Sequence, residues 1–338
     1  MLSRVADSLF WISRYLERAE NISRIVDVNL QLMLDFQTLD DESLKAHWEP
    51  ILQSTAGEDL FHKLYKKCNS KTVTEFLTFQ QKNPNSIVRC LYDARENARM
   101  VRDQISTDMW EEVNKTYLFM RSKEAKKLWS NEPYDFYRRI RMNSLVIQGI
   151  IDATVQQDEG REFLQVGKYL ERADKTTRIL DVKYHILLPS VDDVGGAIDK
   201  VQWGAILRSA SAYDAYKKIY VSDVVPWKVA ELLILSEECP RSIRYCMKML
   251  DLSLRNISGT GKASFSNSAE KLTGRLLSEL NYSSIEDIFK EGLHEYLDQL
   301  QDKFNKIGKE IFKTYIFTPM PSLDEEIDVQ FQQQQQQQ

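Results

Sequence analysis

Apolar residues recur along the first 36 residues at the spacing of an α-helix. They lie three or four positions apart, on one helical face: Val5, Leu9, Ile12, Leu16, Ala19, Ile22 and Val26. The pattern predicts a long helix over about 3–36 that presents this face to a core. A second pattern of the same kind begins near Glu159 and continues to about Leu188, where Pro189 ends it.

The two long segments repeat one another in sequence. YLERAENISRIVDV at 15–28 returns as YLERADKTTRILDV at 169–182, and the match continues downstream in the same order. The offset is 154 residues at these segments and 156 where Pro84 recurs as Pro240. Such a drift is typical of small loop insertions between the helices of a duplicated unit. We therefore expect an all-α fold, a pseudo-twofold duplicated helical bundle with long helices.

Proline and glycine divide the rest of the chain. Pro84 and Pro240 predict matching breaks, with new helices over about 86–105 and 242–254. Residues 256–269 are rich in Gly, Ser and Asn and predict a loop. A last amphipathic pattern over 285–315 predicts a helix that closes the bundle.

These patterns predict one domain over 1–317 that contains two repeats, at about 1–121 and 156–317. The bridge between them is expected at 122–155: a polar connection through Pro133, then a helix from Phe136 to Val155. Residues 318–338 combine acidic residues with a run of glutamines and offer little apolar surface to bury. We expect them to form a disordered tail.

Composition and charge narrow the class of protein. The formal net charge of −5 argues against nucleic acid as a partner. No apolar run approaches the eighteen or so residues that cross a membrane, and charges follow Met1 closely, so we expect a cytoplasmic protein without a membrane contact. The four cysteines form no CxxC pair and are expected to be reduced, buried thiols.

Established catalytic and cofactor motifs are absent from the sequence. It contains no GxxxxGK[ST], GxGxxG or GxSxG pattern. One ExxH motif, Glu291 and His294, has the spacing of a bundle metal site, but such sites need a second copy and two further carboxylates. We therefore expect no metal and no cofactor.

The strongest candidate chemistry lies in the repeated ER dipeptides. Glu17 and Arg18, with their counterparts Glu171 and Arg172, adjoin the apolar stripe, where charged groups must find partners. One interpretation is a structural ion-pair network that fixes helix register. The other is an inter-repeat polar cavity that binds a peptide terminus, carboxylate or phosphate through the arginines, with Glu17 and Glu171 as acid–base groups.

Further charged residues could extend this polar seam. Glu20 with Arg24, and Asp174 with Arg178, have the i,i+4 spacing of pairs on a solvated helix face. The helix after Pro84 carries more charged and polar residues, and we expect it to join the seam.

Three strings in the sequence resemble the alpha-E domain family. They are MLSRVADSLFWISRYLERAENISRIVDVN, ARENARMVRDQIS followed by MWEEVN, and DEGREFLQVGKYLERADKTTRILDVKY. The resemblance covers about 1–317; the glutamine run has no counterpart in it. The residues that match the family's recurrent strings are Tyr15, Glu17, Arg18, Arg24, Asp27, Glu96, Asn97, Arg99, Tyr169, Glu171, Arg172, Arg178 and Asp181.

The resemblance implies a bacterial, all-helical protein, encoded beside a circularly permuted ATP-grasp protein and a transglutaminase-like protein. We therefore expect a non-catalytic helical partner or scaffold, or a peptide-substrate carrier, of an ATP-grasp amide or peptide ligase system. The alternative is an enzyme acting on amide-linked peptides, with Glu17 and Glu171 transferring protons; this requires raised carboxyl pKa values. A third alternative is an assembly module whose apolar stripe docks another helix.

Overall fold

A computed structural model describes residues 1–35, 41–185, 196–221, 223–261 and 264–316. These residues form sixteen α-helices and a short π-helix and contain no strand, which confirms the all-α fold. The elements are α1 (Ser3–Asp35), α2 (Asp41–Ser54), α3 (Glu58–Leu64), α4 (Ser70–Phe79), α5 (Ile87–Met100), α6 (Thr107–Arg121), α7 (Lys123–Asn131), α8 (Pro133–Thr154), α9 (Glu159–His185), α10 (Ala197–Ser209), α11 (Tyr213–Ile219), α12 (Pro226–Leu235), α13 (Ile243–Ser258), α14 (Ser268–Tyr282), α15 (Ile285–Glu291), α16 (Leu293–Ile311) and η2 (Phe312–Ile316).

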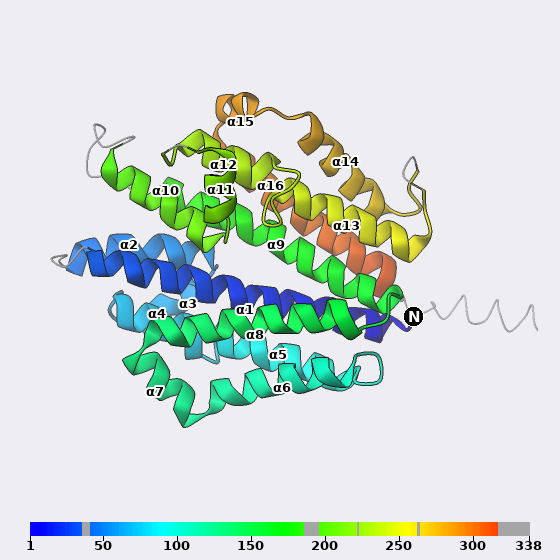
Figure 1. Cartoon of the computed structure of the whole chain (residues 1–338), viewed down its shortest axis with the longest axis horizontal. Helices are drawn as coiled ribbons and strands as arrows, with labels where there is room; N and C mark the ends of the chain where they lie inside the picture. Colours follow the sequence, from blue (N-terminus) through cyan, green and yellow to red (C-terminus); the bar gives the residue numbers. More distant parts are fainter. Residues whose placement is uncertain (36–40, 186–195, 222, 262–263, 317–338) are drawn as a thin grey trace, which may run out of the picture.

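The two long helices that carry the repeated sequence, α1 and α9, pack against each other at the centre of the molecule (Figure 1). They begin at the same end and run parallel, with the Met1 ammonium 3.0 Å from Oε2 of Glu159. Gly167 of α9 lies directly against the backbone of Phe10: a Cβ atom at this glycine would be 2.1 Å from the Phe10 carbonyl oxygen. Only a residue without a side chain fits this approach.

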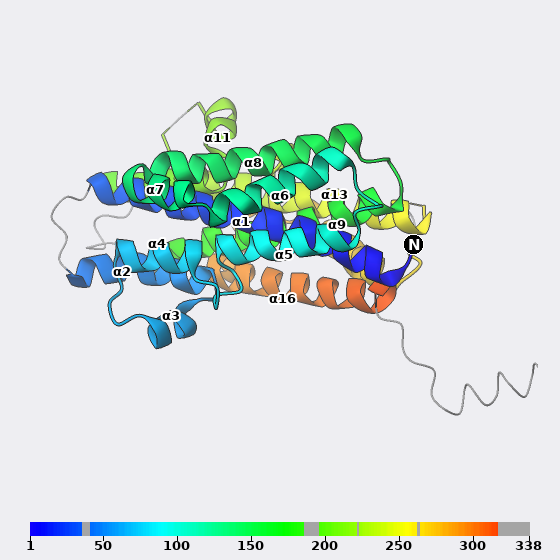
Figure 2. The ribbon, with the colours of Figure 1, turned by 90° about the horizontal axis from the view of Figure 1, so that it is seen from below.

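The remaining helices surround this central pair. Helices α5 and α8 pack on α1, whereas α13 and α16 pack on α9. Figure 2 shows α8 and α16 on opposite sides of the α1–α9 pair. The second helix of each half crosses over, so that α2 contacts α9 and α10 contacts α1. One continuous apolar core joins residues of both halves, among them the fully buried Trp48 and Leu207.

Corresponding positions of the two halves have the same local structure. The Ser86 hydroxyl accepts a hydrogen bond from the Arg89 N–H and caps α5, and Ser242 caps α13 in the same way. The thiols of Cys90 and Cys246 lie 3.7 and 3.8 Å from the carbonyl oxygens of the prolines six residues before them. The predicted breaks at these prolines are therefore confirmed. A twofold relation between whole halves, and the division into repeats at 121 and 156, stay predictions.

Two connections differ from the prediction. Residues 123–131, expected within a polar connection, form α7, because the Ser122 hydroxyl caps its first turn. Pro133 begins α8 instead of preceding it, since proline fits the first helical turn. The last amphipathic pattern is divided at Gly292, whose φ of +108° ends α15 before α16 begins.

Other predictions concern parts of the chain outside the described residues. Pro189 and the tail at 318–338 are among these. Among the helices that the structure describes, none has both the length and the apolar character needed to cross a bilayer. Three of the cysteines are buried and Cys68 is half-buried, all as free thiols.

Candidate functional site

The two ER dipeptides pair crosswise between the central helices. Arg172 donates to both carboxylate oxygens of Glu17, from Nε and Nη2, each at 2.9 Å. Arg18 donates in the same bidentate manner to Glu171, at 2.6 and 3.0 Å. The two glutamates are at most 1% exposed. We call these two interactions the crossed pairs. In each of them, an arginine of one helix neutralises the buried glutamate of the other helix.

A second arginine reinforces the pair at Glu17. Arg241, from the segment between α12 and α13, bridges Glu17 and Glu20 with its two terminal nitrogens. The Gln148 amide of α8 donates to Glu17 at 3.2 Å, and the Ser144 hydroxyl donates to Glu20, also at 3.2 Å. Both oxygens of Glu17 are therefore occupied by donors from three other elements.

The pair at Glu171 is reinforced in a different way. Arg14, one turn before Arg18, donates to Glu171 at 2.7 Å, and the Lys175 ammonium lies 3.5 Å from the other oxygen. The side-chain oxygen of Asn85 accepts a hydrogen bond from Nη1 of Arg18 at 3.1 Å. This glutamate is completely buried and has three cationic neighbours.

The arginines determine the protonation state of both glutamates. Burial alone would raise the pKa of Glu17, but Arg172 and Arg241 outweigh it and lower the pKa to about 2. Burial likewise opposes the ionisation of Glu171, yet Arg18, Arg14 and Lys175 hold its pKa well below the usual range. Both groups are thus fixed as carboxylates at neutral pH. Proton transfer by them would need the opposite shift.

Little space remains beside Glu17 for a ligand. The hollow next to Glu17 lies between α1, α8 and α9, and Gln148 and Lys168 are among its lining residues. Its volume is about 10 Å³, and one water molecule needs about that much. At Glu17 the geometry therefore favours the structural ion-pair network over the polar cavity, because a peptide terminus does not fit there.

Of the other residues of the predicted seam, the two tyrosines lie beside the crossed pairs, and Arg24 and Arg178 form pairs within their own helices. Tyr15 and Tyr169 lie beside the crossed pairs, with the guanidinium carbons of Arg18 and Arg172 each 5.7 Å from the ring centroid of the preceding tyrosine. Arg24 donates to Glu20 and Arg178 donates to Asp174. These two carboxylates are 0% and 7% exposed, so the expectation of a solvated face is wrong for them.

The charged residues of α5 lie apart from the crossed pairs. Glu96 pairs with Arg95 and Arg99 on the same helix, and the Asn97 amide donates to the Asp93 carbonyl oxygen. In the described part of the chain, no hydrogen bond or ion pair joins Glu96, Asn97 or Arg99 to either ER dipeptide. They form a local surface cluster instead.

The ER dipeptides are also the feature by which one protein family is described. The model of the Alpha-E family, described as a predicted alpha-helical domain with a conserved ER motif, matches residues 1–316. The chain belongs to the Alpha-E family. Its sequence contains two ER dipeptides, and they are the ones that form the crossed pairs.

Relatives of this Alpha-E chain occur in mycobacteria. Uncharacterised proteins of Mycobacterium bovis and of two Mycobacterium tuberculosis strains are 23% identical to it over 319 residues. The match covers 88% of this chain but 34% of each relative, so the chain spans about a third of their length. No solved structure matches the chain.

Several residues that pair with the buried carboxylates of α1 could not be found by comparing the two repeated segments of the sequence. Arg241 follows Pro240 directly, but the corresponding residue after Pro84 is Asn85, so a comparison of the copies does not reveal it. Gln148 and Ser144 come from α8, which has no predicted counterpart. Arg141, also on α8, pairs with Asp27 at 2.5 Å.

One group of candidate metal ligands occurs among the described residues: Asp181, His294 and Asp298. The His294 ring nitrogen Nδ1 lies 2.6 Å from Asp181, and Nε2 lies 3.7 Å from Asp298. The hydrogen bond to Asp181 raises the pKa of His294. Both ring nitrogens therefore face carboxylates in an ion-pair arrangement, and Glu291 of the ExxH motif is not part of the group.

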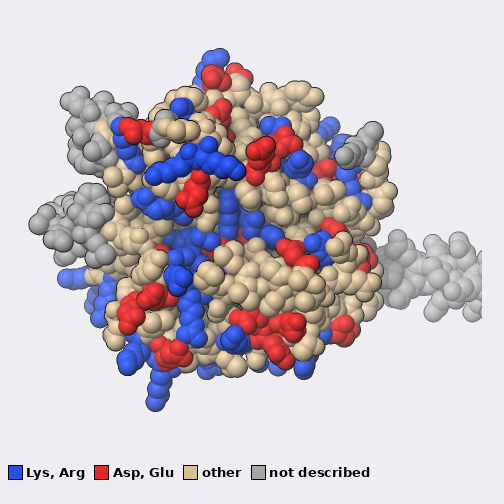
Figure 3. All heavy atoms as spheres, in the orientation of Figure 1, with Lys and Arg blue, Asp and Glu red and all other residues tan. Residues whose placement is uncertain are grey.

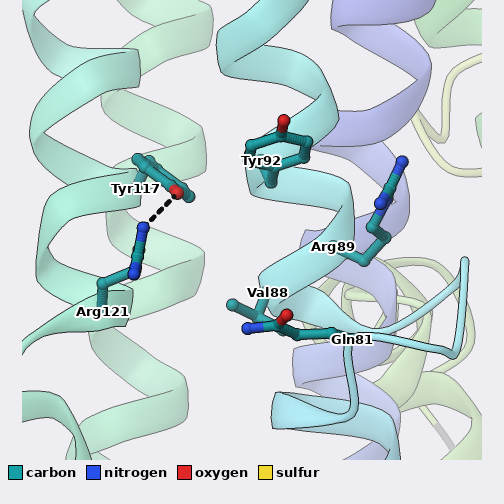
Figure 4. Close-up of a pocket in the computed structure, with 6 residues that line it drawn as sticks. All are labelled: Gln81, Val88, Arg89, Tyr92, Tyr117 and Arg121. Atoms are coloured by element: carbon teal, nitrogen blue, oxygen red, sulfur yellow. Dashed lines mark hydrogen bonds between the residues drawn. The ribbon is translucent and has the colours of Figure 1, made fainter.

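The surface of this Alpha-E protein has its own candidate sites. A cleft of about 330 Å³ opens between α5 and α6, where Arg121 donates to the Tyr117 hydroxyl and the Tyr92 ring stands opposite (Figure 4). Two guanidinium groups, of Arg89 and Arg121, border it. In Figure 3, Lys and Arg gather in a band across the middle of the face that α8 and α11 share. Positive surface thus exists locally despite the net charge of −5.

The lowered pKa of Glu17 predicts an acid-sensitive fold. Its stabilising effect is fully present above the ordinary pKa of 4.5 and is lost as the pH falls toward about 2. Over this window we expect a loss of about 3 kcal/mol from this group. Urea unfolding at pH 7, 5, 4 and 3 should show a shallower pH slope for Glu17→Gln than for the native chain. An unchanged slope would contradict the assignment, and Glu124→Gln, on the surface, serves as the control.

Proposed function

We propose that this chain is a non-catalytic helical partner or scaffold of an ATP-grasp amide or peptide ligase system, and that it carries the peptide substrate of that system. In this role the partner enzyme binds ATP and forms the amide bond. The helical chain supplies a rigid frame and a peptide-binding surface.

The observation that carries the proposal is the state of the two candidate acid–base groups. Glu17 and Glu171 are buried, saturated by guanidinium donors, and held as carboxylates. A hollow of about 10 Å³ beside Glu17 leaves no place for a substrate. These features favour a frame over a catalytic centre, and no observation favours the enzyme alternative.

The lengths of the mycobacterial relatives give independent support. In these proteins the matching region occupies 34% of the chain, so it is covalently joined to other sequence. A helical region that is joined to other sequence within one chain is suited to form contacts with a neighbouring folded unit. The surface cleft and the band of Lys and Arg are available for such contacts.

A binding experiment tests the proposal. The full chain and the circularly permuted ATP-grasp protein from the same genome are mixed at about 10 µM, with and without Mg·ATP, and analysed by size-exclusion chromatography with light scattering. We expect a complex. Two unshifted elution peaks under both conditions would contradict the proposed partnership.

A second measurement separates the scaffold from the enzyme. In a reconstituted ligation assay, Glu17→Gln is expected to retain activity as long as circular dichroism shows it folded. Loss of ligation in a folded variant that still binds the partner would support the enzyme alternative instead.

A further inference from the structure

Two hollows flank helix α16 on the side of the molecule opposite α8. The first, of about 560 Å³, lies between α16, α1 and α9, and Trp11 and Phe312 are among its lining residues. The second, of about 450 Å³, lies between α16 and α14. Lys306 and Lys309 line both hollows. We call these two hollows together the groove; Figure 2 shows α16, which lies between them, along the edge of the bundle.

The groove is rich in cations that lack acidic partners. Lys306 and Lys309 are exposed on α16, and Arg275 and Lys271 face them from α14. Within the described residues, no carboxylate lies within ion-pair distance of Lys306, Lys309 or Arg275. Surface lysines elsewhere, such as Lys303 and Lys248, do have such partners. The charges of Lys306, Lys309 and Arg275 are therefore not neutralised by an ion pair, whereas Lys313 pairs with Glu310 at 2.8 Å.

The first hollow adds an apolar contact surface to this charge. The Trp11 ring stacks on Tyr15 with centroids 5.2 Å apart, which fixes its orientation. Phe312 is 46% exposed. An aromatic wall next to ammonium groups suits a ligand with apolar and anionic groups in alternation.

The dimensions favour an extended chain over a compact ion. Lys306 of α16 and Lys313 of η2 are seven residues apart, about 10 Å along the helix axis, which is about the span of three extended peptide residues. Carboxylates also line the two hollows: Asp302 before Lys306, Glu310 between Lys309 and Lys313, and Asp174 of α9. A continuous phosphate backbone would meet these carboxylates, whereas spaced carboxylate side chains need not.

We propose that this groove binds an extended acidic peptide segment, whose Asp and Glu side chains pair with Lys306, Lys309 and Arg275 and whose apolar atoms contact Trp11. The proposal deepens the peptide-carrier role and rests on it for its biological meaning. Binding by the isolated chain does not require the ligase, so the two proposals can fail separately.

Fluorescence anisotropy with the full chain tests the groove. The probe is a fluorescein-labelled ten-residue peptide in which Asp and Glu alternate with Ser and Leu, titrated at 50 mM and 300 mM salt. We expect saturable binding at low salt that weakens at high salt. Lys306→Glu with Lys309→Glu should weaken it about tenfold or more. Trp11→Phe should reduce the accompanying change in tryptophan emission.

A matched variant controls for total charge. Lys126→Glu with Lys127→Glu changes two exposed lysines of α7 and should alter affinity less than about twofold. Equal weakening by both double variants would overturn the proposal, as would equal binding of a peptide with Asn and Gln in place of the acids. Tighter binding of a ten-nucleotide DNA strand would overturn it in favour of nucleic acid. Circular dichroism confirms that each variant is folded.

Discussion

Replacing Glu171 by Gln is expected to lower the free energy of unfolding by about 3–5 kcal/mol at pH 7, as measured by urea denaturation. The substitution keeps the volume of the side chain but removes the charge that Arg14, Arg18 and Lys175 surround. Glu171 is 0% exposed, so water cannot replace it as a partner. Loss of one member of a buried pair is costly because the other charge stays buried.

Two controls identify the source of this loss. Glu124→Gln removes an exposed partner of Arg139 and should change stability by less than about 1 kcal/mol. Arg18→Met combined with Glu171→Gln should cost less than the sum of the two single changes, because the residues interact directly. Additive effects would show that the crossed pair contributes no coupling and would contradict its assignment.

Replacing Gly167 by Ala is expected to destabilise the fold by about 3 kcal/mol, the upper part of the range for overpacked cores. The new methyl group would lie 2.1 Å from the Phe10 carbonyl oxygen, so α1 and α9 must separate. Separation also lengthens the crossed pairs, which lie one to two turns further along both helices. Thermal unfolding followed by circular dichroism measures the loss.

Gly149→Ala is the matched control for that substitution. Gly149 lies in the exposed side of α8, with nothing within 4 Å of the new methyl group. Alanine favours the helix by about 1 kcal/mol over glycine, so this variant should be slightly more stable than the native chain. Equal destabilisation by both variants would contradict a close approach at Gly167.

The long helices could be predicted because their signals are local. The apolar spacing of α1 and the prolines before α5 and α13 depend only on neighbouring residues, and the structure follows them closely. Helix α7 was not predicted, since its nine residues are mostly polar and its single fully buried residue is Ala125. The capping by Ser122 is the local signal that could have indicated it.

The four ER residues of the candidate site were predictable, but Arg241 and the geometry of the site were not. Charges beside a buried stripe indicated Glu17, Arg18, Glu171 and Arg172. Their crosswise pairing depends on the parallel register of α1 and α9, which no local pattern contains. Glu20 and Asp174 lie outside the apolar stripe, and one buried face per helix predicts that residues outside it are solvated. Helix α1 is instead covered by α5, α8, α9 and α10, so several of its faces are buried.

The crossed pairs also affect how the two similar sequence segments can change during evolution. Segments far apart in a chain ordinarily accumulate substitutions independently of each other. Here a substitution at Arg18 removes a hydrogen-bond partner of Glu171, 153 positions away, and a substitution at Glu17 removes a partner of Arg172. Each ER dipeptide therefore constrains the other, and both can persist while the residues around them change.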